Sequence, residues 1–182
     1  MAAKRSFTLI IVERVQDMVV RPAEATDLEA ILAIYNEGIV DRIATLEEEP
    51  KDQDYIEAWF SVHQQRYRVL VADMAGDGVV GWVSLNPYSS RCAYAGVADL
   101  SVYVGRRWRG RGVGSALLKA IEPVAQAQGF YKIVLFTFPF NEAGQRLYRK
   151  QGYRTVGTFF QQGILDGQFV DVMAMEKLLS KD

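Results

Sequence analysis

Hydrophobic and polar positions alternate along this chain with two spacings, and together they predict a mixture of helices and strands. Apolar residues recur three or four positions apart in residues 28–39, 55–62 and 113–124, as they do on the buried side of an amphipathic helix. A shorter helix is expected just before Gly152, because glycine commonly ends a helix. These segments predict four helices.

Short apolar runs between the helices predict the strands. Two hairpins are expected, one turning at Ala75–Gly78 and one near Asp166-Gly167, because glycine with aspartate favours tight turns. The remaining strands are a short one after Met18 and the runs 96–104 and 131–138. The predicted order is β-α-α-β-β-β-α-β-α-β-β.

This order predicts the α/β (α+β) class, with one domain whose mixed, mostly antiparallel central sheet is flanked by helices. Residues 96–104 and 131–138 are joined through a helix, so they should form a parallel crossover. In such a unit the helix begins beside the carboxyl end of its strand, where α/β proteins usually bind ligands. We therefore expect the functional site near residue 105.

Composition narrows the classes of partner. The 182 residues carry a net charge of −1, so we expect no nucleic-acid and no membrane partner. The single Cys92 and single His63 exclude a disulfide within the chain and a Cys/His zinc cluster, so no metal is expected. We expect His63 to be a partly exposed helix residue and Cys92 a half-buried filler. The protein is predicted to be cytoplasmic.

The first 18 residues are predicted to be an extension that precedes a domain over 19–182. Their apolar run, 7–12, is too short for a secretory signal and ends at Glu13 and Arg14 without a cleavage site of small residues. The extension is expected to form an extra edge strand or to be a leader, and nothing in it suggests chemistry.

The stretch "RRWRGRGVGSALL", residues 106–118, combines arginines and glycines at the start of a helix. Glycines let a ligand approach the main chain, and the first helical turn offers free N–H groups to an anion. No Gly-Lys-Ser/Thr follows, which excludes a Walker loop, and Ser115 stands where a dinucleotide fingerprint has glycine. A phosphate or pyrophosphate site is predicted, the alternative being a glycine-rich turn with solvated arginines.

The motif "RGRGVG", 109–114, resembles the pyrophosphate loop of GNAT N-acetyltransferases, and "NEAGQRLYRKQGY", 141–153, is similar to a second segment of that family. Four further motifs are similar to the phosphinothricin acetyltransferase branch: "IYNEGI", "PYSSRCAY", "ADLSVYV" and "DGQFVDV". The resemblance covers about residues 19–178. It implies a GNAT-like fold and acetyl-CoA as the acetyl donor.

The resemblance also implies roles for individual residues. The pyrophosphate would lie against Arg109, Gly110, Arg111, Gly112, Val113, Gly114 and Ser115. The pantetheine arm would pair with Val102, Tyr103 and Val104, where one N–H can stabilise the thioester oxyanion. Asn141 would hydrogen-bond the same arm.

Two residues are implied to be catalytic. Asp99 stands where this branch has a glutamate base, and its side chain is one methylene shorter than glutamate. Alternatively, Asp99 is a structural carboxylate of the strand whose hydrogen bonds are satisfied by its neighbours. Tyr148 matches the proton donor to the CoA sulfur, and the alternative is a core tyrosine.

The expected substrate-binding residues are Arg91, Tyr94 and Asn36, while Ser89 replaces a second basic residue of the branch. Arg91 is alternatively a solvated loop cation.

We therefore expect an acetyl-CoA-dependent N-acetyltransferase acting on a small amino acid or analogue, of the phosphinothricin, methionine sulfone or methionine sulfoximine type. Two alternatives remain: an N-acetyltransferase of proteins or peptides, and a non-catalytic acyl-CoA sensor. The resemblance further implies a homodimer formed through the terminal hairpin, with Phe159, Phe160 and Phe169 on its surface; alternatively, these residues pack on the protein's own sheet.

Overall fold

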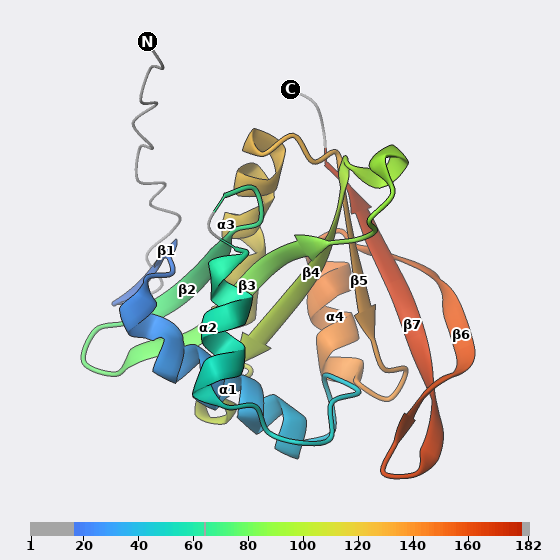
Figure 1. Ribbon diagram of the computed structural model, residues 1–182, viewed down its shortest axis with the longest axis horizontal. Helices are drawn as coiled ribbons and strands as arrows, with labels where there is room; N and C mark the ends of the chain where they lie inside the picture. The colour runs from blue at the N-terminus through green and yellow to red at the C-terminus, as the bar shows by residue number, and fades with distance from the viewer. Residues whose placement is uncertain (1–16, 64, 180–182) are drawn as a thin grey trace.

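The computed structural model describes residues 17–63 and 65–179, which form seven strands and four helices (Figure 1). The strands are β1 (Met18–Pro22), β2 (Val69–Met74), β3 (Gly78–Pro87), β4 (Val97–Val104), β5 (Lys132–Thr137), β6 (Arg154–Leu165) and β7 (Gln168–Leu178). The helices are α1 (Leu28–Val40), α2 (Gln53–Ser61), α3 (Val113–Ala127) and α4 (Glu142–Lys150). The predicted order of elements is confirmed. The extension predicted over residues 1–18 lies almost wholly outside the described residues.

All seven strands belong to one sheet with the order β1-β2-β3-β4-β5-β7-β6. The crossover from β4 to β5 is parallel and all other pairs are antiparallel, as the sequence predicts. Both hairpins turn where expected: Asp166 and Gly167 have φ values of 48° and 73°, which the second turn requires.

Helices cover both faces of this sheet. Strand side chains alternate between the faces, so Trp82 packs with α1 and α2 whereas its neighbour Val83 packs with α3. Figure 1 shows α1 and α2 crossing in front of the strands that α3 covers from behind. The α3 side holds the larger core, which includes Leu117, Leu118 and Ile121. The mixed, mostly antiparallel sheet flanked by helices is therefore confirmed.

The sheet divides between β4 and β5. Their pairing covers only Val97↔Lys132, Ala98↔Ile133 and Asp99↔Val134. Beyond Asp99 the strands point apart, and α4 is seen between them in Figure 1. The second half of β4 therefore pairs only with β3, and its other edge borders an opening.

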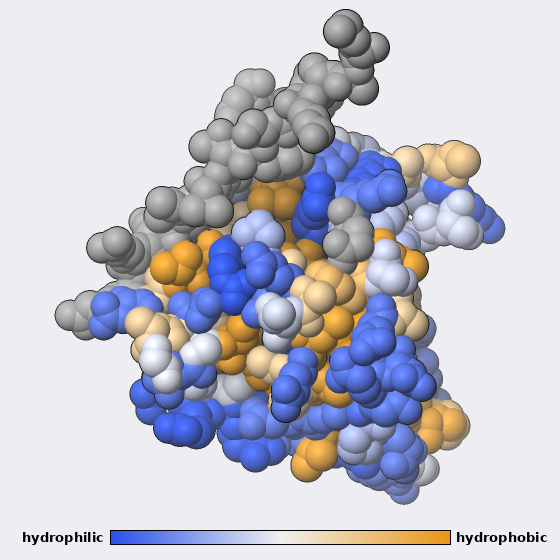
Figure 2. Space-filling view, turned by 60° about the vertical axis from the view of Figure 1, so that its left-hand side comes forward, coloured by the Kyte–Doolittle hydropathy of each residue, from blue (hydrophilic) through white to orange (hydrophobic). Residues whose placement is uncertain are grey.

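Apolar surface remains on the terminal hairpin. Strand β6 is the last strand of the sheet, and Phe159, Phe160 and Phe169 are 50%, 80% and 67% exposed. The face that comes forward in Figure 2 is the side of β1, α1 and α2, away from this hairpin, and on it apolar residues gather in the middle with hydrophilic residues around them. Half or more of each phenylalanine is therefore exposed in the single chain, and both the homodimer and packing on the chain's own sheet stay predictions.

Candidate active site

The opening beside β4 exposes main-chain groups of the strand. Hydrogen bonds in an antiparallel pair alternate between its two sides. Because Gly105 N–H donates to Val80 O over 2.9 Å, Tyr103 is the next residue that bonds to β3. Val102 and Val104 therefore direct their N–H and C=O groups into the opening. Strand β4 can accept an extended ligand there as if it were another strand.

The turn after β4 leads into α3 through two glycines in left-handed conformation. Gly110 and Gly112 have φ values of 72° and 87°, which other residues rarely adopt. A Cβ atom at either position would meet nothing within 4 Å, so the main chain there borders open space. Gly112 caps α3, whose first N–H groups therefore face this space. Such a helix start fits a phosphate or pyrophosphate group.

The third glycine of the motif has another purpose. A Cβ atom on Gly114 would lie 2.8 Å from Leu147 Cδ2, so a side chain there would displace the Leu147 side chain of α4. Gly114 thus allows close packing of the two helices, and these helices form opposite walls of the opening.

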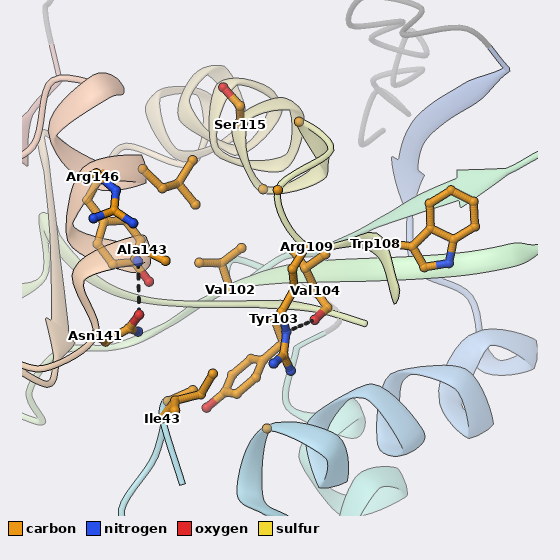
Figure 3. Close-up of a pocket in the computed structure, with 18 of the residues that line it drawn as sticks. Ile43, Val102, Tyr103, Val104, Trp108, Arg109, Ser115, Asn141, Ala143 and Arg146 are labelled. Atoms are coloured by element: carbon orange, nitrogen blue, oxygen red, sulfur yellow. Dashed lines mark hydrogen bonds between the residues drawn. The ribbon is translucent and has the colours of Figure 1, made fainter. Parts of the chain in front are cut away.

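The opening is a cavity of about 430 Å³ (Figure 3). Its walls come from the end of α1, from β4, from the glycine turn and from α4. The predicted residues that line it are Val102, Tyr103, Val104, Arg109, Gly110, Gly112, Gly114, Ser115, Asn141 and Tyr148. Arg111 does not line it, because its guanidinium lies over the Trp108 ring, 5.4 Å from the centroid. The side chain of Val113 is buried in the core.

The arginines of the turn are tied to the end of α1. Arg109 donates to Val104 O over 3.0 Å, which Figure 3 shows, and to Asp41 Oδ2 over 2.6 Å. Arg106 also pairs with Asp41, and its N–H donates to Glu37 Oε2. A hydrogen bond from Arg106 and a weaker contribution from Arg109 hold the pKa of Asp41 below its usual range. The turn thus has a fixed position, and part of the charge of Arg109 is neutralised.

Asn141 has a structural task besides any contact with a ligand. It precedes α4, and its Oδ1 accepts the N–H of Gly144 over 3.0 Å, as Figure 3 shows. Its Nδ2 donates to Thr137 Oγ1 over 3.3 Å. Asn141 is therefore the N-cap of α4, a role that the sequence analysis missed although asparagine favours this position.

Tyr148 lies on α4 against the same cavity and is buried. Burial raises the pKa of Tyr148 to about 12. Its phenol is therefore neutral near pH 7, and a neutral phenol can donate a proton or a hydrogen bond.

Asp99 lies between two further cavities, of about 230 and 330 Å³. Tyr103 lines both of these and the larger cavity. Burial raises the pKa of Asp99 to about 6, while hydrogen bonds from Asn86 and from Leu100 N–H act in the opposite direction. Of the described residues that line these two smaller cavities, only Asp99 carries a charge.

The first of these cavities is mainly aromatic. Trp82 and Tyr103 stack with centroids 4.7 Å apart, and Tyr35 meets Tyr103 edge-on at 5.1 Å. Its remaining lining residues are Tyr55, Ile56, Trp59, Asn86, Asp99 and Ser101. A carboxylate in such surroundings suits the ammonium group of a small ligand.

The expectation for His63 is wrong. Its side chain is 5% exposed, and its Nε2 lies 3.0 Å from Asn86 Oδ1. Asn86 Nδ2 in turn donates towards Asp99 Oδ2 over 3.4 Å. His63 is buried because it follows the last turn of α2, which lies against the sheet. Sequence reasoning also missed Asn86, although it faces Asp99 across the β3–β4 ladder.

The three predicted substrate-binding residues do not line the three cavities. Asn36 uses both ends of its amide on the main chain of Lys51, over 2.9 and 2.8 Å. Arg91 and Tyr94 are exposed on the loop between β3 and β4. Cys92 is exposed on the same loop, so the expectation of a half-buried filler is wrong.

The terminal hairpin closes one side of the second small cavity. Arg42 pairs with Asp166 over 2.9 Å, and Asp166 N–H donates to Glu48 Oε1 over 2.6 Å. Gly163 leaves room for Leu46, whose side chain lines that cavity. The tip of the hairpin is thus fastened to the segment between α1 and α2.

Two absences apply to the described part of the chain. Residues 17–63 and 65–179 contain no group of three or more His, Cys, Asp or Glu side chains that could hold a metal ion. None of the helices found in those residues has the length and apolar character needed to cross a membrane.

Known proteins that resemble the chain agree with this geometry. An L-methionine sulfoximine/L-methionine sulfone acetyltransferase of Pseudomonas aeruginosa is 34% identical, over 86% of this chain and 92% of its own length. A phosphinothricin acetyltransferase from Sinorhizobium meliloti, solved in complex with acetyl-CoA, superposes with a TM-score of 0.85 at 27% identity, covering 91% of this chain and 90% of its own. A ribosomal-protein-alanine N-acetyltransferase from Brucella melitensis superposes with a TM-score of 0.84 at 32% identity, covering 88% and 99%.

The family assignment rests on the greater part of the chain. Residues 30–153 match the acetyltransferase (GNAT) family, and this segment includes the opening, the glycine turn and both predicted catalytic residues. Acetyl-CoA is the donor in this family, which confirms the predicted cosubstrate. The chain belongs to the acetyltransferase (GNAT) family and is an N-acetyltransferase.

Proposed function

We propose that the protein acetylates the α-amine of a small amino acid or analogue, of the methionine sulfone, methionine sulfoximine or phosphinothricin type. The observation that carries this proposal is Asp99, the one charged residue lining the two smaller cavities beside the opening of β4. An ammonium group is attracted to this carboxylate, and cavities of about 230 and 330 Å³ have room for a small acceptor beside it. The relatives with amino-acid analogues in their names support the same class.

The chain's residues fit the donor. The left-handed glycines and the start of α3 suit its pyrophosphate, with Ser115 beside them, and the free edge of β4 suits the amides of its pantetheine arm. Arg146 and Lys150, which line the same cavity, add positive charge that the sequence analysis missed. When bound, acetyl-CoA supplies an activated acetyl group and a thiol leaving group.

The reaction needs a base, a donor to the oxygen and a donor to the sulfur. Asp99 accepts a proton from the acceptor's ammonium group, and the freed lone pair forms the new N–C bond as the C–S bond breaks. Val102 N–H points into the opening and can stabilise negative charge on the thioester oxygen. The neutral Tyr148 phenol would donate its proton to the departing sulfur, and the second proton of the acetylated nitrogen would return to the Tyr148 oxygen, so the charge balances when Asp99 later releases its own proton.

The acceptor's carboxylate lacks a cation in the two smaller cavities, because Arg91 is exposed on its loop. A homodimer that covers the terminal hairpin and completes the acceptor site is therefore part of the proposal. The exposed Phe159, Phe160 and Phe169 on the edge hairpin support it.

Light scattering tests the dimer and should give twice the 20.5 kDa of one chain. Phe160→Asp should give monomers, whereas Val19→Asp on the opposite edge should not; unchanged dimers in both variants contradict this interface.

An assay of thiol release across a panel of amines tests the function. We expect release from acetyl-CoA to depend on methionine sulfone or methionine sulfoximine, and less on phosphinothricin, because Ser89 stands where a second cation is needed. A panel without release above the rate of Asp99→Asn overturns the proposal. Tight binding of CoA without any release supports the sensor instead.

A peptide acceptor is the second candidate, supported by the similarity to the ribosomal-protein-alanine N-acetyltransferase. The fastening of Asp166 to Arg42 and Glu48 opposes it, because it holds the tip of the hairpin against the segment between α1 and α2 and reduces the room for a peptide there. Peptides with N-terminal alanine belong in the same panel, and release that requires them would favour this candidate.

A further inference from the structure

His63 is the single histidine of the chain, and both its ring nitrogens face oxygen atoms. Nδ1 lies 2.6 Å from Trp59 O and Nε2 lies 3.0 Å from Asn86 Oδ1. The ring also packs on the Trp59 ring, with centroids 4.4 Å apart. Since a main-chain carbonyl can only accept, Nδ1 must carry a proton.

Asn86 connects this histidine to Asp99. It lies directly opposite Asp99 in the β3–β4 ladder. Its Oδ1 receives a hydrogen bond from Ser84 Oγ at 3.0 Å and faces His63 Nε2. Its Nδ2 donates to Ser101 Oγ over 3.1 Å and towards Asp99 Oδ2 over 3.4 Å. One end of the amide thus serves the histidine and the other end serves the carboxylate.

The orientation of this amide affects the charge on Asp99. With its NH₂ group towards Asp99, the amide of Asn86 stabilises the carboxylate. If the amide were turned by about 180°, its oxygen would face the carboxylate oxygen of Asp99 and repel it. The observed orientation places the amide oxygen against His63 Nε2, which is favourable only when that nitrogen also carries a proton. A proton on Nε2 and a negative charge on Asp99 therefore favour the same amide orientation.

We propose that His63 is a positioning residue for this enzyme, which acts through Asn86 to keep Asp99 charged and its carboxylate fixed beside the acceptor cavities. The titratable groups that face Asp99 from the elements around it are phenols: Tyr35 on α1, Tyr55 on α2 and Tyr103 on β4. No described lysine, arginine or second carboxylate lines those cavities. The hydrogen bonds through Asn86 thus connect Asp99 to a side chain outside these cavities. The role of the base rests on the proposed function, whereas the link itself does not.

Kinetics of two substitutions test the positioning role. His63→Leu removes the donor to Asn86, so the acidic limb of the kcat/KM profile should move to higher pH, and activity near pH 6 should fall about fivefold or more. His63→Gln offers an amide N–H in place of Nε2 and should restore most of that activity. The KM for acetyl-CoA should not change in either variant. Val62→Ala, at an exposed neighbouring position, is the matched control.

A profile for His63→Leu whose acidic limb coincides with that of the wild type overturns the proposal. Equal losses at all pH values in His63→Leu and His63→Gln overturn it as well, because they indicate a purely structural role.

Nuclear magnetic resonance tests the link without any substrate. In the protein without a histidine tag, the imidazole ¹⁵N signals belong to His63 alone. Asp99→Asn should change the ¹⁵N chemical shift of Nε2 at a fixed pH, because Asn86 joins the two side chains by hydrogen bonds. In an Asn86→Leu background the same substitution should have a much smaller effect. An unchanged Nε2 chemical shift in Asp99→Asn overturns the link. If no amine supports thiol release, the proposed function fails while this measurement still decides the link.

Discussion

Replacing Asp99 by asparagine should stabilise the folded protein at neutral pH while it removes the base. The unfolded chain has an aspartate pKa of 3.8, and burial raises the pKa of Asp99 to about 6 in the folded state. The folded protein therefore binds this proton more tightly than the unfolded chain. The resulting stabilisation is complete below pH 3.8 and is lost as the pH rises through about 6. Above pH 6 the buried charge reduces the free energy of unfolding.

The size of this effect follows from the two pKa values. A difference of one pKa unit corresponds to about 1.4 kcal/mol, so moving from 3.8 to about 6 gives about 3 kcal/mol at high pH. Asparagine has nearly the same shape and no charge to bury. For a domain of this size, about 3 kcal/mol raises the melting temperature by about 6–12 °C. The gain should shrink by about 2 kcal/mol between pH 8 and pH 4.5.

Calorimetric melting curves of the wild type and of Asp99→Asn at pH 8 and pH 4.5 measure this difference. Asp77→Asn is the matched control, because Asp77 lies exposed in the turn between β2 and β3. Its melting temperature should follow that of the wild type at both pH values. The quantity to compare is the stability gain of Asp99→Asn over the wild type. If this gain is no larger at pH 8 than at pH 4.5, the view that a buried charge is held at position 99 is refuted. The same variant should lose kcat by about 10²-fold or more.

Substitutions at Tyr148, Gly112 and Asn141 separate proton donation, donor binding and folding. Tyr148→Phe should lower kcat by about 10²-fold with little change in the KM for acetyl-CoA, as measured by thiol release, because only the proton donor is lost. Gly112→Ala should weaken acetyl-CoA binding in calorimetric titrations by about five- to thirtyfold, because a left-handed φ of 87° strains a residue with a Cβ atom by about 1–2 kcal/mol. Gly157→Ala, where a Cβ meets nothing within 4 Å, should bind normally. Asn141→Ala should lower the free energy of unfolding by about 1 kcal/mol in denaturant titrations, whereas Asn141→Asp, which keeps the cap of α4, should not.

The order of elements and the glycine turn could be predicted from the sequence because both are local. Helical spacing, hairpin turns and the start of α3 each depend on neighbours within a few residues. The parallel crossover also follows from local order, since a strand, a helix and a strand in succession leave little choice. The position of the cavity beside β4 therefore follows largely from local sequence.

The surroundings of Asp99 could not be predicted in the same way. Asn86 contacts Asp99 only because of the β3–β4 register, and the loop 88–96 between these strands leaves that register open. His63 reaches Asn86 only because α2 ends against the sheet. The pairing of Arg109 with Asp41 depends on where α1 ends, and the two residues are 68 positions apart in the sequence. Contacts of this kind carry no periodic signal in a single sequence.

The shorter side chain at position 99 agrees with its surroundings. A glutamate would extend one methylene further into the cavities and away from the ladder position that Asn86 faces. An aspartate stays beside Asn86, and cavities of about 230 and 330 Å³ leave room for a water molecule as well as a small acceptor. Burial among aromatic rings raises the pKa of this carboxylate towards neutrality, and Asn86 counters part of that rise. These two effects together leave Asp99 charged near pH 7. They also make it a stronger base than a solvated aspartate, so it accepts a proton from an ammonium group more readily.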